Sequence, residues 1–207
     1  MIVWVIAVLL FSVILHEIAH GWMALKFGDP TAKYLGRLTL NPIPHLDLFG
    51  SIILPTLLAI TGAPILGWAK PVPVNFWKLR PQKLGIICVS LAGIVTNLAI
   101  AVVVGLIFRL LAVTEVANGL VYSLLFTTVY LNVLLAIFNL LPIPPLDGSR
   151  ILTLWLPEEM RIRLEQMSLI FIMALFILLP YFFQFISPII LAIVCLLTGW
   201  NPQSLAL

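Results

Sequence analysis

The chain has 207 residues, of which 62% are hydrophobic and only 9% are charged, and its formal net charge is +3. Soluble domains carry roughly 25% charged residues, so this composition excludes an ordinary soluble domain and indicates a polytopic membrane protein. The small positive charge does not indicate a nucleic-acid-binding protein, because the basic residues lie in short loops between apolar runs, where they act as topology signals.

The first apolar run covers residues 2–25 and contains the sequence His16-Glu17-Ile18-Ala19-His20 near its C-terminal end. The run is long enough for one membrane crossing, which needs about 20 residues, and it lacks the basic start of a cleaved leader. In a helix, residues i and i+4 share one face, so His16 and His20 can direct their imidazole nitrogens at one point, with Glu17 beside them. This pattern predicts half of a zinc site. A third protein ligand and an open position for water, which Glu17 can deprotonate, would complete it.

Three ionisable groups within five residues of a membrane helix are costly to retain. A charged side chain at the centre of a bilayer costs about 2.5–3.5 kcal/mol even on the mildest scale. A lone histidine on an apolar face is most simply a hydrogen-bonded core residue, but that interpretation does not account for all three groups. We therefore favour metal binding.

Residues 26–78 combine two polar stretches with one interrupted apolar run. The alternation of side chains over residues 34–40 predicts a short strand or hairpin. Residues 46–68 are apolar but are broken by Pro55 and by Gly62-Ala63-Pro64, which favours a re-entrant segment over a full crossing. His45 and Asp47 precede this segment, and two interpretations stay open: auxiliary polar groups near the mouth of the site, including a pH-sensitive contact, or interfacial loop residues.

The rest of the chain predicts further membrane helices. Residues 84–111 and 119–141 are long enough to cross, residues 167–186 form another apolar run, and residues 188–200 are expected to complete a hairpin with it. The predicted fold is an all-α polytopic membrane protein with about five transmembrane helices, a re-entrant segment and a small β-hairpin near the site. We expect one domain over residues 1–207, with a core at 2–150 and C-terminal helices at 151–200. Cys88 and Cys195 are isolated and lack metal or redox spacing.

The third metal ligand has few candidates among the carboxylates in or beside apolar segments. Glu115 lies in a short loop and the carboxylates after Glu158 alternate with arginines, so these groups are most simply solvated. Of the remaining two, we select Asp147 over Asp47. Three prolines break the helix just before Asp147, which directs its carboxylate into protein or a water-lined space rather than lipid.

Together, the motif from His16 to His20 on one membrane helix and the motif from Asn139 to Gly148 at the end of another resemble the site-2 protease family of intramembrane zinc metalloproteases. Residues 45–75 resemble the minimal members, which lack PDZ and CBS domains. The resemblance implies that His16, His20 and Asp147 bind one zinc ion and that Glu17 is the general base. It also implies that Asn139 lies near the site and that Asn97 helps to hold the substrate or to stabilise the oxyanion. The family commonly has proline after the Ala92-Gly93 pair, where this chain has Ile94.

The function implied by the resemblance is hydrolysis of peptide bonds within transmembrane segments of membrane protein substrates, that is, regulated intramembrane proteolysis. The substrate must unwind before cleavage, and the strand expected at residues 34–40 could pair with it. The alternative from another class is a non-proteolytic membrane zinc carrier or sensor, which would need the same ligands but not Glu17. We expect the lipid bilayer, a transmembrane substrate, and a partner that presents or pre-cleaves it as partners, and no nucleic acid.

Topology provides a check on the proposed ligands. For Asp147 to meet His20, the ends of the runs at 2–25 and 119–141 must lie on the same side of the membrane. Three crossings satisfy this condition, provided that residues 46–68 dip in and return. The positive-inside rule then predicts a cell-membrane protein with its site nearer the cytoplasmic side. Arg109 would lie outside, and ten basic residues would face the cytoplasm: Lys26, Lys33, Arg37, Lys70, Lys78, Arg80, Lys83, Arg150, Arg161 and Arg163.

Overall fold

The computed structural model describes residues 2–53, 56–57, 60, 68–114 and 117–200, and the described residues form helices and no strand. Three helices are long and apolar enough to cross a membrane: α1 (Ile2–Lys26), α4 (Gln82–Thr114) and α5 (Gly119–Leu140). The prediction of an all-helical membrane protein is therefore confirmed. About five transmembrane helices were expected, and the described part of the chain supports three.

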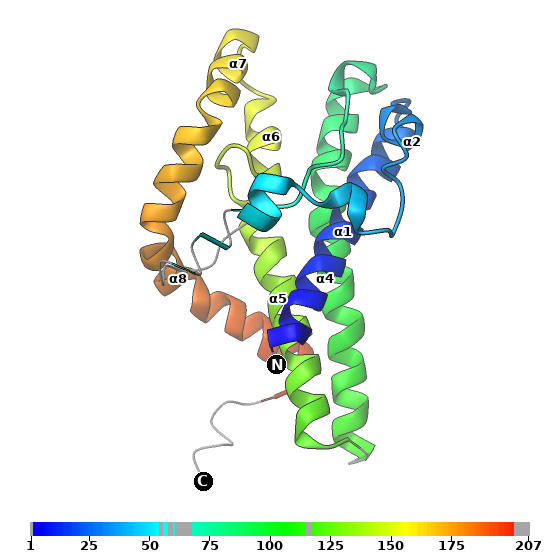
Figure 1. The fold of residues 1–207 in the computed structure, drawn as a ribbon, viewed down its shortest axis with the longest axis vertical. Coiled ribbons are helices and arrows are strands. Elements are labelled where there is room, and N and C mark those ends of the chain that lie inside the picture. Colours follow the sequence, from blue (N-terminus) through cyan, green and yellow to red (C-terminus); the bar gives the residue numbers. More distant parts are fainter. Residues whose placement is uncertain (1, 54–55, 58–59, 61–67, 115–116, 201–207) are drawn as a thin grey trace.

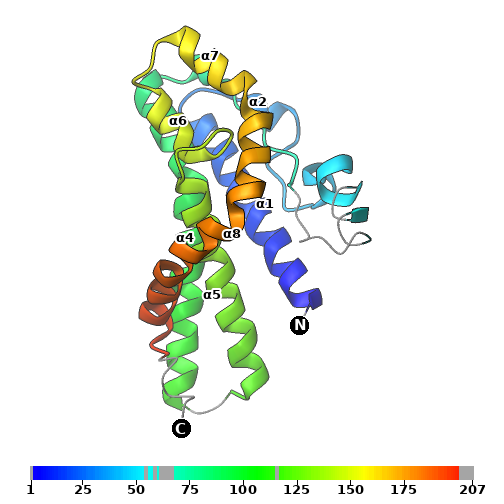
Figure 2. The same ribbon diagram turned by 90° about the vertical axis from the view of Figure 1, so that its left-hand side faces the viewer.

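Shorter elements surround these three helices. They are α2 (Thr31–Tyr34), the 3-10 turns η1 (Ile43–His45) and η3 (Phe76–Lys78), the π-helix η2 (Leu48–Ile53), α6 (Asp147–Thr153), α7 (Glu158–Gln166) and α8 (Ser168–Thr198). Figures 1 and 2 show α4 and α5 as a long antiparallel pair, with α1 crossing it. Helices α6 and α7 lie at the end of the molecule where α1 ends and α4 begins.

Two hydrophobic clusters hold the helices together. One lies among α4, α5 and α8 and consists of Ala101, Val129, Val133, Ile190 and Val194. The other lies where α1 ends and α4 begins and consists of Ala24, Leu79, Ile86 and Val89. Because the second cluster fixes the end of α1 against the start of α4, it also fixes the histidine-bearing turns of α1.

Helix α8 replaces the hairpin that we predicted for the C-terminal region. The two apolar runs, residues 167–186 and 188–200, belong largely to this single helix, which continues through positions 180 and 188. Figures 1 and 2 show that α8 is bent. Proline is tolerated in membrane helices at the cost of a kink, so prolines that would normally end a soluble helix do not mark a chain reversal here.

The strand or hairpin predicted for residues 34–40 is wrong. These residues form the end of α2 followed by turns and bends. Gly36 has a φ of +64°, in the left-handed region, which breaks an extended chain. Arg37 is buried and donates hydrogen bonds from Nη2 to the carbonyl oxygens of Lys70 and Pro71. Alternating side chains therefore do not project to two faces of a ribbon in this segment.

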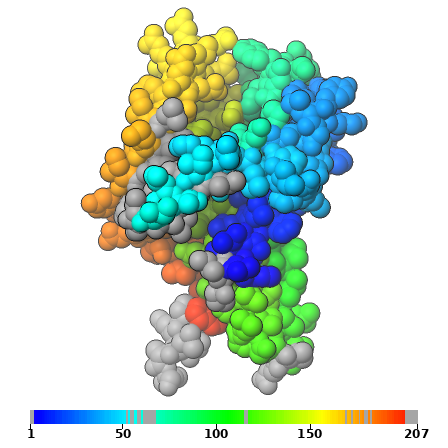
Figure 3. Space-filling model, viewed as in Figure 1, coloured from blue at the N-terminus to red at the C-terminus, as the bar shows by residue number. Residues whose placement is uncertain are grey.

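The predicted re-entrant segment falls largely outside the described residues, but its described ends lie together. The amide of Trp68 donates to the carbonyl of Gly50 (3.1 Å), and Ser51 Oγ donates to the carbonyl of Trp68 (2.8 Å). The amide of Lys70 donates to the carbonyl of His45 (2.8 Å). These bonds join residues 45–51 to residues 68–70. In Figure 3, the described part around η2 (cyan) lies across the face between α1 and α8.

His45 and Asp47 serve local structure. His45 is buried, and its Nε2 lies 2.9 Å from the carbonyl oxygen of Thr39. The Asp47 carboxylate accepts a hydrogen bond from the amide of Gly50 (2.6 Å). Of the two interpretations left open, these contacts favour that of loop residues.

Candidate metal centre

The two histidines of α1 face one point. His16 and His20 lie one turn apart and are almost fully buried, with 5% and 7% of their surfaces exposed. Their Nε2 atoms are 2.9 Å apart, and the rings are nearly perpendicular, at 81°. The helical spacing therefore produces the convergence predicted from the sequence.

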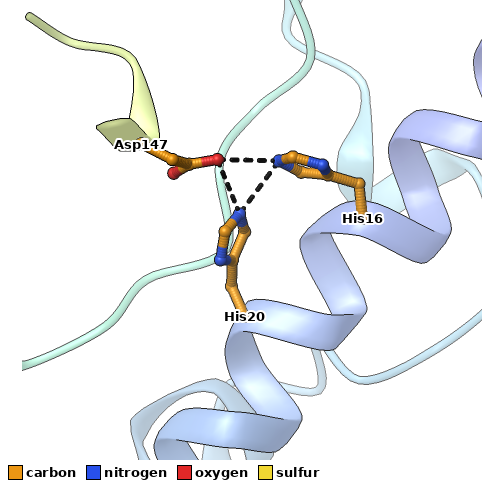
Figure 4. Close-up of side chains that lie close together, drawn as sticks. All are labelled: His16, His20 and Asp147. Atoms are coloured by element: carbon orange, nitrogen blue, oxygen red, sulfur yellow. Dashed lines mark hydrogen bonds and ion pairs between the residues drawn. The ribbon is translucent and has the colours of Figure 1, made fainter. Parts of the chain in front are cut away.

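Asp147 supplies the third group from the start of α6. Its Oδ2 atom lies 3.0 Å from Nε2 of His16 and 3.2 Å from Nε2 of His20 (Figure 4). A side chain at the next residue, Gly148, would collide with the backbone carbonyl of Leu140. Glycine therefore allows α6 to fold back against the end of α5, and this turn brings Asp147 to the histidines.

The hydrogen bond of His20 determines which ring nitrogen is free. Its Nδ1 lies 2.7 Å from the carbonyl oxygen of Val89 on α4, to which it donates. A neutral imidazole then has no hydrogen on Nε2, so Nε2 presents a lone pair. That lone pair faces the Oδ2 atom of Asp147, which is also an acceptor. Two acceptors so close are stable together when a cation lies between them.

The arrangement fits zinc. Zinc in proteins takes nitrogen and oxygen ligands at about 2.0–2.1 Å in a tetrahedron, which separates neighbouring ligand atoms by about 3.3 Å. The three distances among Nε2 of His16, Nε2 of His20 and Oδ2 of Asp147 are 2.9–3.2 Å, close to one face of that tetrahedron. Two imidazoles and one carboxylate leave the fourth position to water or substrate, as in catalytic zinc sites.

Gly93 of α4 forms one wall of the site. A Cβ atom added at this position would collide with the imidazole of His16. Sequence reasoning quoted Gly93 only as part of a motif and missed this role. A glycine inside an otherwise apolar helix was the available signal, since such a residue often marks a close approach of another group.

Glu17 follows the first ligand on α1 and is held by a backbone amide. Its Oε2 atom accepts a hydrogen bond of 2.7 Å from the amide of Val72. This contact joins α1 to a segment 55 residues later in the chain. No sequence pattern predicts this contact, because a backbone donor has no side-chain signature.

The two asparagines predicted near the site differ in their surroundings. Asn97 lies one turn beyond Gly93 on α4 and is fully buried, and within the described part of the chain neither its Oδ1 nor its Nδ2 has a hydrogen-bond partner. Asn139 is partly buried, and its Nδ2 donates to the carbonyl of Leu135 in its own helix (3.0 Å). Buried amides are normally paired, so Asn97 has hydrogen-bonding capacity left for a ligand.

Cys88 and Cys195 are free thiols. Neither belongs to a cluster of potential metal ligands, and the described residues contain one such cluster, formed by His16, His20 and Asp147.

Comparison with known proteins identifies the family. The protein-family model described as peptidase family M50 matches residues 108–180 of the sequence, which include Asp147. The Bacillus subtilis protein named "Putative zinc metalloprotease YwhC" is 41% identical over 172 residues, covering 79% of this chain and 74% of the relative. "Putative zinc metalloprotease Rip2" of Mycobacterium tuberculosis H37Rv is 35% identical over 183 residues, covering 84% of this chain and 67% of the relative. No solved structure matches. On this similarity over most of its length, the chain belongs to peptidase family M50, the site-2 protease family, whose members use zinc.

Proposed function

We propose that this metalloprotease hydrolyses peptide bonds within transmembrane segments of membrane proteins. The observation that carries the proposal is the position of the metal centre. Two of its ligands and Glu17 lie on α1, a helix long and apolar enough to cross a membrane. A peptide bond reaching these residues would therefore belong to a chain inside or at the edge of the bilayer.

The chemistry divides between the metal and Glu17. Bound zinc supplies a Lewis acid that lowers the pKa of water and polarises a carbonyl group. His16, His20 and Asp147 hold the ion. Glu17 takes the proton from the attacking water and later passes it to the leaving amine. Its Oε2 atom is engaged by the amide of Val72, which leaves Oε1 for the water.

Asn97 is proposed to bind the substrate or the oxyanion. Its unpaired, buried amide on the same face of α4 as Gly93 supports this role. A donor aimed at the charge that develops in the transition state is typically worth about 100- to 1,000-fold in rate. We also propose that Asn139 lies close enough to contribute, although its nitrogen is engaged within α5.

The orientation follows from the basic residues. Arg109 lies near the end of α4 that joins α5, whereas the other ten lysines and arginines belong to the opposite end of the long helices or to the segments beside it. The positive-inside rule places that second end in the cytoplasm. We therefore propose a cell-membrane protease whose metal centre lies nearer the cytoplasmic side, with a separate partner that presents or first trims the substrate.

The test is cleavage of a panel of model transmembrane substrates by purified protein, with bound zinc measured in the same samples. We expect wild-type protein to cleave at least one substrate and a chelator to abolish cleavage. Glu17→Gln should retain zinc and lose activity by about 100- to 10,000-fold, the usual contribution of a general base. Equal zinc in both proteins without cleavage of any substrate would instead favour a zinc carrier or sensor.

A further inference from the structure

Residues 70–75, here called the strap, form no helix or strand and lie beside the second half of α1. The strap packs directly on the helix. Val72 is only 6% exposed, and a Cβ atom added at Gly21 of α1 would lie 3.0 Å from its side chain. The strap therefore lies against the turn of α1 that carries Glu17 and His20.

The strap carries the amide that binds Glu17. Val72 lies between Pro71 and Pro73, neither of which has an N–H group, so Val72 provides the single backbone donor of this tripeptide. That donor bonds to Oε2 of Glu17 at 2.7 Å. The prolines also restrict the backbone on both sides of the donor, which reduces the freedom of the amide to move away.

Arg37 holds the first part of the strap. Its Nη2 donates to the carbonyl oxygens of Lys70 (2.8 Å) and Pro71 (3.3 Å). The residue is only 8% exposed. Its guanidinium therefore holds the two backbone carbonyl groups immediately before Val72 by hydrogen bonds.

Asp29 holds the other end. Its Oδ2 accepts a hydrogen bond of 2.6 Å from the amide of Asn75, and its Oδ1 accepts bonds from the amide and the hydroxyl of Thr31. Asp29 is fully buried. It therefore joins the strap to the loop after α1.

These two buried charges have no opposite charge beside them among the described residues, where the ion pairs found involve Asp147 and the two histidines. Burying a charge without a partner of opposite sign is costly unless hydrogen bonds satisfy it. Both hydrogen bonds of the Arg37 guanidinium, and one of the three that the Asp29 carboxylate accepts, go to the strap backbone. The protein thus uses two buried charges to fix a six-residue segment whose central amide contacts Glu17.

We propose that Arg37 and Asp29 are positioning residues, which hold the strap so that the amide of Val72 keeps the Glu17 carboxylate oriented toward the water it deprotonates. This inference rests on the proposed role of Glu17 as general base. Displacement of a reacting group by about 1 Å can cost about 100-fold in rate. Loosening the strap should therefore lower kcat while leaving zinc in place.

The first test compares Val72→Pro with Val72→Ala. Both variants lose the valine side chain, but only proline removes the amide hydrogen. We expect Val72→Pro to have a kcat at least about tenfold below that of Val72→Ala, with similar KM and equal zinc. An equal kcat in the two variants would overturn the proposal. Loss of zinc from Val72→Pro alone would also overturn it, because the strap would then support the metal rather than Glu17.

The second test leaves the strap sequence intact and compares Arg37→Gln with Arg80→Gln. Arg80 is exposed and is a control for the hydrogen bonds, because its Nη1 donates to two backbone carbonyls, those of Trp77 and Leu79, outside the strap. We expect Arg37→Gln to lower kcat at constant zinc and Arg80→Gln to have little effect. Asp29→Asn should resemble Arg37→Gln. Equal losses in Arg37→Gln and Arg80→Gln would mean a general effect on folding and would contradict the proposal.

Hydrogen exchange separates failure of this inference from failure of the proposed function. Residues 71–75 contain only three exchangeable backbone amides, since Pro71 and Pro73 have none. We expect exchange in this segment to be faster in Glu17→Ala and Arg37→Gln than in wild type or Arg80→Gln. If wild-type protein cleaved no substrate, the proposed function would fail, and this measurement would still decide whether Glu17 and Arg37 hold the strap. Unchanged exchange in both variants would overturn the inference.

Discussion

The two ends of the helix bundle differ in the ionisable residues that they bury among the described residues. At the end where α1 finishes, the protein buries His16, His20, Asp29, Arg37 and His45. At the other end, among α4, α5 and α8, the buried cluster is apolar, and the buried polar residues Asn132 and Thr198 are neutral. The cluster consists of Ala101, Val129, Val133, Ile190 and Val194. Buried polar groups cost free energy unless they are paired, whereas apolar packing costs nothing of this kind. The comparison indicates that the first end is built for chemistry and the second for stability.

Arg109, a charged residue near the apolar end, has a structural task, which supports this distinction. Its Nε donates to the carbonyl of Leu197 (2.8 Å), and its Nη2 donates to the carbonyl of Leu196. These carbonyls belong to the last turn of α8, where backbone acceptors lack helical partners. Arg109 therefore caps α8, and a positive charge at a helix C-terminus is also electrostatically favourable.

The largest effect is expected from a substitution that removes a ligand of the metal centre. Asp147→Ala should lose zinc and lower cleavage by more than about 100-fold, because losing a residue that merely supports a metal ligand already costs about 10- to 100-fold. Zinc content and cleavage rate are the measurements. Asp47→Ala is the control, since Asp47 was the other carboxylate considered from the sequence and caps a local turn. Zinc loss from Asp47→Ala with retention in Asp147→Ala would refute our choice of ligand.

An intermediate effect is expected from two glycines of α4. Gly93→Ala would press against the imidazole of His16, whereas Gly105→Ala would press against Leu197 of α8 at 3.1 Å. We expect Gly93→Ala to weaken zinc binding by about 10- to 100-fold and Gly105→Ala to leave it unchanged. Zinc titration of the metal-free proteins measures both. Equal zinc affinities of the Gly93→Ala and Gly105→Ala variants would contradict the difference that we describe between the two ends.

The smallest effect is expected at the far end. Arg109→Ala should destabilise the protein by about 0.3–1 kcal/mol, the usual value of a charge at a helix terminus, and should leave the cleavage rate of the folded protein unchanged. Thermal unfolding in detergent, with cleavage measured below the transition, provides the comparison with wild type. A large loss of cleavage at an unchanged unfolding temperature would connect Arg109 to the chemistry and contradict the division between the ends.

The convergence of His16, His20 and Asp147 could be predicted from the sequence because its signals are local. His16 and His20 are one helical turn apart, and three prolines before Asp147 show where a helix must end. The supporting contacts could not be predicted in this way. The amide of Val72 meets Glu17, and Gly93 meets His16, across long separations in the chain. Such contacts depend on how the helices pack, which residue spacing alone does not determine.

The two incorrect fold predictions have related causes. Alternation over residues 34–40 indicated a strand, but it does not reveal that Gly36 is left-handed or that Arg37 points inward to the strap. The division between residues 167–186 and residues 188–200 indicated a hairpin, but α8 continues through it. In each case tertiary packing or the membrane environment outweighs a local preference that would hold in a soluble protein.

X-ray absorption at the zinc edge of the purified protein tests the central claim most directly, because it reports the ligands themselves. Our account predicts one zinc per chain, bound by two imidazole nitrogens and by oxygen, with the two-imidazole signal lost in His20→Ala. Substoichiometric zinc, or a sulfur ligand from Cys88 or Cys195, would contradict it.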